Sequence, residues 1–391
     1  MKRNRIKVGV FAIVLLLLAM LFSGCGSETE ILHFDQSHLK ESSSKDHYAY
    51  GTLTDEEKTV YDQIVHAIED REESVLVSTK DTRVLEKAYM AMRYDYCDFF
   101  WTDSYEYELY SNNQKEPVKL YFKPVYNCTE VEQEQYQTQI DTEAERMLKD
   151  LPENASDYEK VYYVYRTLIQ ETSYSEEAQN NQNIVSTFVT HETVCQGYAY
   201  GAQYLLNRIG IPCITVCGTS EGANHSWNLI QMDGDYYYMD VTWGEMEYWQ
   251  ELQVPPESAS GMENMEDVIN YSYLGVSDKD TSFMENHIPL DYVPMPECTA
   301  TKDNYYVHEG LYFDSWDKNA VGAVIRKAYN AGDNTVCIKF ATKELYDTAF
   351  SYIIDEDHWA DYCDVKRITY VDQFDTNVFM LDFSPDTVYS D

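Results

Sequence analysis

The segment from Val194 to Pro212 constrains the fold of this chain most, because it predicts a buried helix with definite ends. Its apolar residues recur at three- and four-residue spacing, which is typical of one buried helix face. Gly210 closes the helix, and Pro212 prevents it from restarting. Gly197 lowers helix propensity, as does Gly201, so we expect another element to pack closely against their side. The apolar positions are Tyr198, Ala199, Ala202, Leu205, Leu206 and Ile209.

Cys195 falls in the first turn of this predicted helix. The backbone N–H groups of a first turn have no partner within the helix, and the helix dipole is positive there. Both features favour a thiolate, and the same N–H groups could hold an oxyanion that forms next to it.

A hairpin is predicted around Asp233-Gly234, a dipeptide typical of two-residue turns between strands. In that register Trp227 faces Asp240, and His225 faces Thr242, so all four side chains share one face of the sheet. Diagonal neighbours on one face lie roughly 7–8 Å apart at the backbone, which lets an imidazole and a carboxylate meet. A slip of one residue would place them on opposite faces.

Cysteine, histidine and aspartate in this order are the residues that thiol acyl transfer requires. A thiol attacks a carbonyl as a thiolate, so a neighbouring base must take its proton. His225 is the candidate base for Cys195, and Asp240 is the candidate carboxylate that fixes the orientation of the imidazole.

Residues 157–244 resemble the transglutaminase-like superfamily, a branch of the papain-like cysteine acyl-transfer folds. The resemblance rests on four motifs in this order: Cys-Gln-Gly-Tyr-Ala at the helix start, Gly-Ile-Pro at its exit, His-Ser-Trp-Asn, and Asp-Val-Thr-Trp. It implies that Cys195 is the nucleophile, His225 the base and acid, and Asp240 the orienting carboxylate. It implies no calcium requirement, and we expect no cofactor and no metal.

Several side chains near these motifs have both a functional and a structural interpretation. Tyr198, Trp227 and Trp243 are candidates for the wall of a substrate cleft, and equally for plain core packing. Gln196 and Asn224 could each supply an amide to an oxyanion, although Gln196 is equally interpreted as a solvated helix residue.

His191 lies four residues before Cys195 and can be considered as a metal ligand. The sequence contains no further ligand cluster with zinc spacing near it, which argues against that role.

The amino terminus resembles a bacterial lipoprotein signal. Four basic residues precede an apolar run from Val8 to Phe22, and Phe22-Ser23-Gly24-Cys25 follows at once. Cys25 is therefore the predicted lipid attachment site, although Phe22 departs from the usual aliphatic residue. The alternative is an uncleaved membrane anchor, and both interpretations predict an extracytoplasmic, membrane-anchored protein at the cell surface or in the periplasm.

The net charge of the chain is -39, and it becomes -43 when the four basic residues of positions 1–24 are removed. Such a surface repels nucleic acid and anionic headgroups, so we expect no nucleic-acid partner. It would favour cationic partners such as lysine-bearing peptides, or it is simply a solvated acidic surface. Residues 25–50 are predicted to be a flexible tether.

Nine cysteines include Cys25 and Cys195, and the other seven cannot all pair within the chain because their number is odd. An extracytoplasmic setting permits disulfides, and a reducing habitat would leave the thiols free. Cys213 and Cys217 fall on the same face of a predicted strand and are interpreted as core residues.

The predicted fold class is α+β, with a central papain-like core in which the nucleophile helix packs on an antiparallel sheet. We predict a mixed N-terminal α/β region at 51–150, the transglutaminase-like core at 151–290, and a small α+β module at 300–391. Helices are predicted at 55–68, 84–92, 129–149, 158–172, 321–331 and 344–355, and strands within 99–126 and at 305–313, 335–340, 366–372 and 377–383.

The function expected from these features is that of a surface-anchored protein that acts on amide bonds of peptides or proteins, including cell-wall peptides, through a thioester, by hydrolysis. The alternatives are a transglutaminase that crosslinks proteins and a cell-surface scaffold that binds without turnover.

Overall fold

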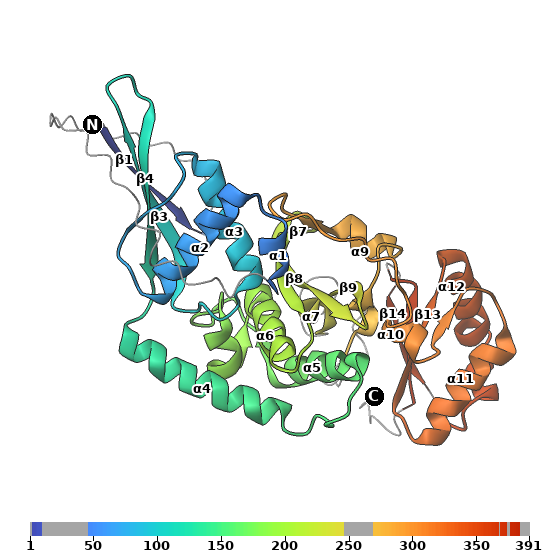
Figure 1. The fold of residues 1–391 in the computed structure, drawn as a ribbon. Helices are drawn as coiled ribbons and strands as arrows, with labels where there is room; N and C mark the ends of the chain where they lie inside the picture. The colour runs from blue at the N-terminus through green and yellow to red at the C-terminus, as the bar shows by residue number, and fades with distance from the viewer. Residues whose placement is uncertain (1, 10–45, 246–268, 367, 374–375, 384–391) are drawn as a thin grey trace. The chain divides into compact units, whose positions relative to one another are not determined.

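The computed structural model describes residues 2–9, 46–245, 269–366, 368–373 and 376–383 (Figure 1). It confirms the α+β class: helices pack beside sheets whose strands are mostly antiparallel. The chain groups into two compact units. The first comprises 1–233, 240–242 and 287–297, and the second 234–239, 243–286 and 298–391. The domain boundaries predicted from the sequence stay a prediction.

The first unit opens with helices and a four-stranded sheet. The helices are α1 (Tyr48–Gly51), α2 (Asp55–Glu69) and α3 (Thr82–Asp95). The sheet has the order β1-β3-β4-β2 with antiparallel neighbours, from β1 (Lys2–Gly9), β2 (Val75–Leu76), β3 (Thr102–Ser111) and β4 (Pro117–Tyr126). The two helices and the aromatic strand set predicted here are confirmed.

Two further helices follow, α4 (Glu130–Leu148) and α5 (Asp157–Glu171), as predicted. Each begins at a capping box, in which a hydroxyl accepts from the N3 backbone and the N3 glutamate accepts from the N-cap backbone. These pairs are Thr129 with Glu132, and Ser156 with Glu159.

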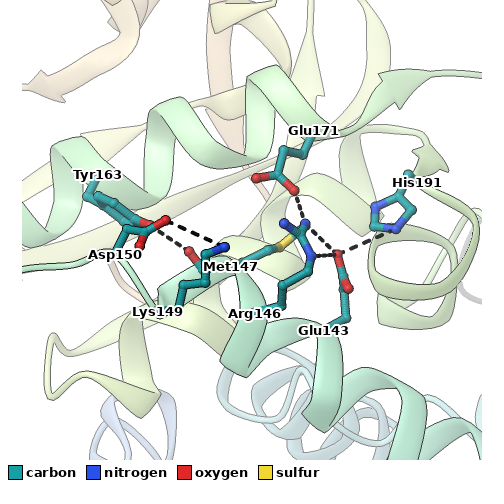
Figure 2. Close-up of polar contacts among 8 residues, drawn as sticks. All are labelled: Glu143, Arg146, Met147, Lys149, Asp150, Tyr163, Glu171 and His191. Carbon is teal, nitrogen blue, oxygen red and sulfur yellow. Dashed lines mark hydrogen bonds and ion pairs between the residues drawn. The ribbon is translucent and has the colours of Figure 1, made fainter.

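An ionic cluster joins these two helices to the segment that leads to Cys195. Arg146 on α4 contacts Glu143 one turn earlier and Glu171 at the end of α5 (Figure 2). Glu143 Oε1 also lies 3.6 Å from His191 Nε2. The cluster therefore ties both helices to the turn at His191, whose φ of 58° is left-handed.

The centre of the first unit is α6 (Cys195–Arg208), which packs against β7 (Cys213–Ser220) and β8 (Ala223–Met232). Strand β7 pairs antiparallel with β8 on one side and with β11 (His287–Pro289) on the other. Short strands β5 (Ser173–Tyr174) and β6 (Glu192–Thr193) pair in parallel ahead of α6. The predicted helix and strand are confirmed, and every residue from 196 to 206 of α6 is buried.

The two glycines of α6 lie against the π-helix η3 (Ser186–Thr190) and β6. A Cβ at Gly197 would come within 1.9 Å of Thr193 Oγ1, and one at Gly201 within 2.7 Å of Thr187 Cγ2. The close packing predicted from these glycines is confirmed.

The second unit begins with β9 (Asp235–Met239), which pairs antiparallel with β10 (Leu274–Val276). The 3-10 helix η4 (Tyr271–Tyr273) precedes β10, and helices α9 (Thr281–Asn286) and α10 (Tyr305–His308) follow it.

A small α+β module closes the second unit, as predicted. Its sheet has the order β12-β13-β15-β14, from β12 (Tyr312–Phe313), β13 (Thr335–Phe340), β14 (Thr369–Gln373) and β15 (Val378–Asp382). Its helices are α11 (Lys318–Ala331), α12 (Lys343–Phe350), the π-helix η5 (Ser351–Asp355) and the 3-10 helix η6 (His358–Asp361). Ile338, Phe340, Tyr346 and Phe379 are at the centre of its core.

The strand predicted at 305–313 is wrong for most of its length, because helix α10 occupies its start and only β12 is extended. Gly310 has a left-handed φ of 71° and turns the chain between them. Tyr305 stacks on Tyr271, with ring centroids 4.0 Å apart, and Tyr306 is buried. This aromatic packing outweighs the strand preference of the tyrosines.

Several predictions fall on residues 10–45 and 246–268, which lie outside the described residues. They concern Cys25, most of the apolar run and tether, and part of the predicted core at 151–290. In the described part of the chain, no helix is both long and apolar enough to cross a membrane.

Candidate active site

Cys195 is the first residue of α6, and its side chain is partly exposed. The residue at the N-cap position is Val194, which has no side-chain oxygen that could cap the helix. The N-cap side chain therefore accepts no hydrogen bond from the N–H groups of the first turn. These N–H groups can instead stabilise a negative charge beside the sulfur.

His225 lies on β8 opposite Gly218 of β7, and only 4% of it is exposed. Its Nε2 is 2.6 Å from Asp240 Oδ2, and the Cys195 side chain also interacts with its ring. Because Nε2 is engaged with the carboxylate, Nδ1 is the ring nitrogen left to interact with the thiol. The structure thus brings together the three residues that the sequence singled out.

The electrostatics of this pair favour an imidazolium and a carboxylate. Burial alone would lower the pKa of His225, but the charge of Asp240, its hydrogen bond and the Cys195 side chain together raise it to about 10. Burial alone would raise the pKa of Asp240, but His225 and a second histidine, His287, hold it well below its usual range.

The strand predicted to carry Asp240 ends earlier than expected. β9 stops at Met239, and Val241–Gly244 form the short helix α7, so Asp240 lies between a strand and a helix and Thr242 is helical. The predicted extension of the strand to Trp243 is therefore wrong. Asp233 and Gly234 do form the predicted turn, with left-handed φ values of 50° and 88°.

His287 on β11 is a member of the site that the sequence did not reveal. Its Nε2 is 2.9 Å from the same oxygen, Asp240 Oδ2, that His225 contacts. Its ring centroid lies 5.5 Å from that of His225 and 5.1 Å from that of Trp227. No local pattern marks it, since its position depends on the pairing of β11 with β7.

Among the described residues, His225, Asp240 and His287 form one group whose potential ligand atoms all lie within 4.8 Å of one another, so we considered it as a metal site. Ligand atoms at 2.0–2.1 Å around a tetrahedral zinc lie about 3.4 Å apart. The contacts of 2.6 and 2.9 Å are shorter than that and are typical of hydrogen bonds. We therefore describe a hydrogen-bonded cluster. His191 is outside it and faces Glu143.

The three aromatic residues considered for a cleft wall are all buried. Tyr198 is fully covered and its hydroxyl donates to the Thr172 carbonyl, while Trp227 is 1% and Trp243 is 4% exposed. Of the two interpretations, core packing is the one that these contacts favour.

The two amide side chains considered for oxyanion binding lie in different surroundings. Gln196 is buried and its Oε1 accepts from the Ser226 hydroxyl at 2.8 Å, so the solvated interpretation is wrong. Asn224 is exposed.

All eight cysteines in the described residues are free, and Cys213 and Cys217 are buried, as predicted for core residues.

Residues 146–243 match the sequence profile of the transglutaminase-like superfamily. This part of the chain is thus similar to that superfamily. The match contains α5, α6, β7, β8 and β9, and with them Cys195, His225 and Asp240. The transglutaminase-like core therefore coincides with the residues that the geometry brings together.

Kyphoscoliosis peptidase of Mus musculus is 28% identical over 116 residues, which are 25% of this chain and 18% of that protein. The chain thus spans less than a fifth of the length of this relative. Among solved structures, a TGase is similar with a TM-score of 0.26 at 17% identity, over 33% of this chain and 42% of that one. A candidate cysteine protease from Cytophaga hutchinsonii is similar with a TM-score of 0.25 at 15% identity, over 35% and 61%.

Proposed function

We propose that the chain is a thiol acyl-transfer enzyme that cleaves amide bonds of peptides or proteins through a thioester on Cys195. The observation that carries the proposal is the contact chain from the Cys195 thiol through the His225 ring to Asp240, at the start of α6. Each member has the neighbour that its role requires.

The chemistry follows from these contacts. The Cys195 thiol gives its proton to His225, and the thiolate sulfur bonds to the carbonyl carbon of the amide. The negative charge that forms on the carbonyl oxygen is stabilised by N–H groups at the start of α6. His225 then returns the proton to the leaving amine as the C–N bond breaks, and a thioester remains.

Water resolves the thioester in the hydrolytic form of the reaction. His225 takes a proton from the water as its oxygen bonds to the thioester carbon, and the C–S bond breaks. The proton returns to the sulfur, and a carboxylic acid leaves. A lysine amine in place of water would produce a crosslink, so the acceptor decides between hydrolysis and transglutamination.

The proposal includes an extracytoplasmic protein attached to the membrane by a lipid on Cys25. The basic residues, the apolar run and Phe22-Ser23-Gly24-Cys25 support it. Its substrates would then be peptides or proteins outside the cytoplasm, cell-wall peptides among them.

The test incubates the purified protein with a glutamine-containing peptide and a labelled primary amine. Cys195→Ala is the inactive comparison, and Cys128→Ala is the matched control, because Cys128 is a free, partly exposed thiol outside the site. Peptide cleavage or release of ammonia that only Cys195→Ala abolishes supports hydrolysis. Incorporation of the amine would show that the reaction is crosslinking and not hydrolysis.

A thiol reagent tests the site without any substrate. In the proposed state, iodoacetamide at pH 6 alkylates Cys195 much faster than Cys128, because His225 holds the thiol proton. Peptide mass spectrometry separates the two sites, since the tryptic peptides that end at Arg208 and Arg146 each contain one cysteine. Equal rates, together with no turnover, would overturn the proposal and leave a binding scaffold.

A further inference from the structure

We infer that His287 is a positioning residue that fixes the Asp240 carboxylate for His225. This inference rests on the proposed function of Cys195 and goes beyond the Cys-His-Asp set. Two nitrogens, His225 Nε2 at 2.6 Å and His287 Nε2 at 2.9 Å, approach the single oxygen Asp240 Oδ2. Asp240 is completely buried, and His287 is 2% exposed.

The two contacts determine where the protons lie. A carboxylate oxygen only accepts, so each histidine donates an N–H from Nε2. For His225 this leaves Nδ1 to face the Cys195 thiol, which is the arrangement that the reaction needs. For His287 it means that its Nε2 proton is committed to Asp240, so its hydrogen bond acts on the reaction by holding Asp240.

The second donor has a geometric purpose. A carboxylate held by one donor can rotate about its Cα–Cβ and Cβ–Cγ bonds, and the imidazole that it steers moves with it. Two donors from different strands fix the position of Oδ2, since a rotation that keeps one contact breaks the other. Groups that orient a reacting side chain in this way typically change its performance 10–100-fold when they are removed.

The sheet brings His287 to this place. On β7, Gly218 faces His225 of β8, and Ser220 faces His287 of β11. Gly218 and Ser220 are two residues apart, so both histidines lie on the same face of the sheet. A Cβ at Gly218 would come within 2.5 Å of the Trp227 ring, so the glycine leaves the space in which Trp227 packs against His287.

Titratable neighbours act on both His225 and Asp240. In the described part of the chain, Asp240 and Cys195 act on His225, and His225 and His287 act on Asp240. Cys195 in turn acts on Cys217 of β7. The carboxylate that His287 and His225 share therefore links them, beside the direct contact of their rings.

Two variants separate the hydrogen bond of His287 from its volume. His287→Gln keeps an N–H donor at nearly the position of Nε2, while His287→Leu fills similar space without a donor. We expect His287→Leu to lower the rate of Cys195 alkylation at pH 6 and kcat about tenfold, with KM and the alkylation of Cys128 unchanged. We expect His287→Gln to restore both rates to within about threefold of wild type.

Circular dichroism and melting curves establish that each variant is folded. Wild-type rates in a folded His287→Leu, or a His287→Gln as slow as His287→Leu, would overturn the inference. Imidazole ¹⁵N spectra of histidine-labelled protein give a readout without turnover, and a proton on Nδ1 but not Nε2 of His287 would also overturn it. A wild-type Cys195 no faster than Cys128 would instead overturn the proposed function.

Discussion

Replacing Asp240 by asparagine tests the electrostatic core of the site with almost no change in shape. Asparagine keeps the volume and one carbonyl oxygen but removes the negative charge. The position is completely buried, and its Oδ2 contacts two histidines, so the surroundings offer no water to replace the lost charge. We expect Asp240→Asn to remain folded and to lose most of the reactivity of Cys195.

The size of the effect follows from the charges. Two unit charges about 4 Å apart interact by about 4 kcal/mol at an effective dielectric constant of 20. That energy is about three pKa units. It agrees with the pKa of His225, which Asp240 helps to raise from its ordinary value near 6.5 to about 10. Asp240→Asn leaves the lowering effect of burial unopposed, so it should bring the pKa of His225 to its ordinary value or below and reduce the imidazolium–thiolate population at least about 10²–10³-fold.

The assay is the rate of alkylation of Cys195 by iodoacetamide at pH 6, read from the tryptic peptide that ends at Arg208, with Cys128 as the internal reference. Asp240→Asn should slow Cys195 by two to three orders of magnitude, and leave Cys128 unchanged. A folded Asp240→Asn whose Cys195 reacts within threefold of the wild-type rate would refute the reasoning, because the thiolate would then not depend on Asp240.

Three further predictions concern stability. Gly197→Ala should lower the free energy of unfolding by about 1–2 kcal/mol, since the clash with Thr193 Oγ1 exceeds the gain in helix propensity of about 1 kcal/mol; chemical denaturation measures it, and a stabilised variant would contradict the packing. The pKa of His225 is raised in the folded state, so the stabilisation by its charge is complete below about pH 6.5 and is lost as the pH rises through about 10. The difference in free energy of unfolding between wild type and His225→Gln should therefore shrink over that pH range. A constant difference would count against the ion pair. Lys339→Met leaves the mostly buried Asp280, its partner at 2.6 Å, without a cation and should lower the free energy of unfolding by about 2–3 kcal/mol, measured by chemical denaturation. Adding Asp280→Asn removes the unpaired charge and keeps the oxygen that accepts from the Phe283 backbone, so it should recover most of that loss; no recovery would argue against the pair.

The nucleophile helix could be predicted because its determinants are local. Helical periodicity, Gly210 and Pro212 fixed the element, and the low propensity of Gly197 indicated the contact with Thr193 that the structure contains. The turn at Asp233-Gly234 could be predicted for the same reason, since left-handed φ values at both positions favour these two residues.

The end of the second hairpin strand could not be predicted from the same kind of signal. Val241, Thr242 and Trp243 are β-branched or aromatic and favour a strand, yet they form helix α7. Asp240 reaches His225 all the same, because it directly follows the last residue of β9. The contact was thus predicted correctly from a register whose final residues were wrong.

The role of His287 could not be predicted, because it depends on which strands pair in the assembled sheet. It follows His225 by 62 positions in the chain, and it meets Asp240 only because β11 pairs with the edge of β7 that faces away from β8. Nothing in the sequence near His287 specifies that strand order. The contact between His225 and Asp240 can be predicted from the sequence of a single hairpin. The contact between His287 and Asp240 cannot, because it depends on β8 and β11 pairing with opposite edges of β7. The precision of the site is therefore a property of the assembled sheet, and substitutions on β11 should affect the reactivity of Cys195 through Asp240 even though β11 lies outside the segment 146–243 that identifies the superfamily.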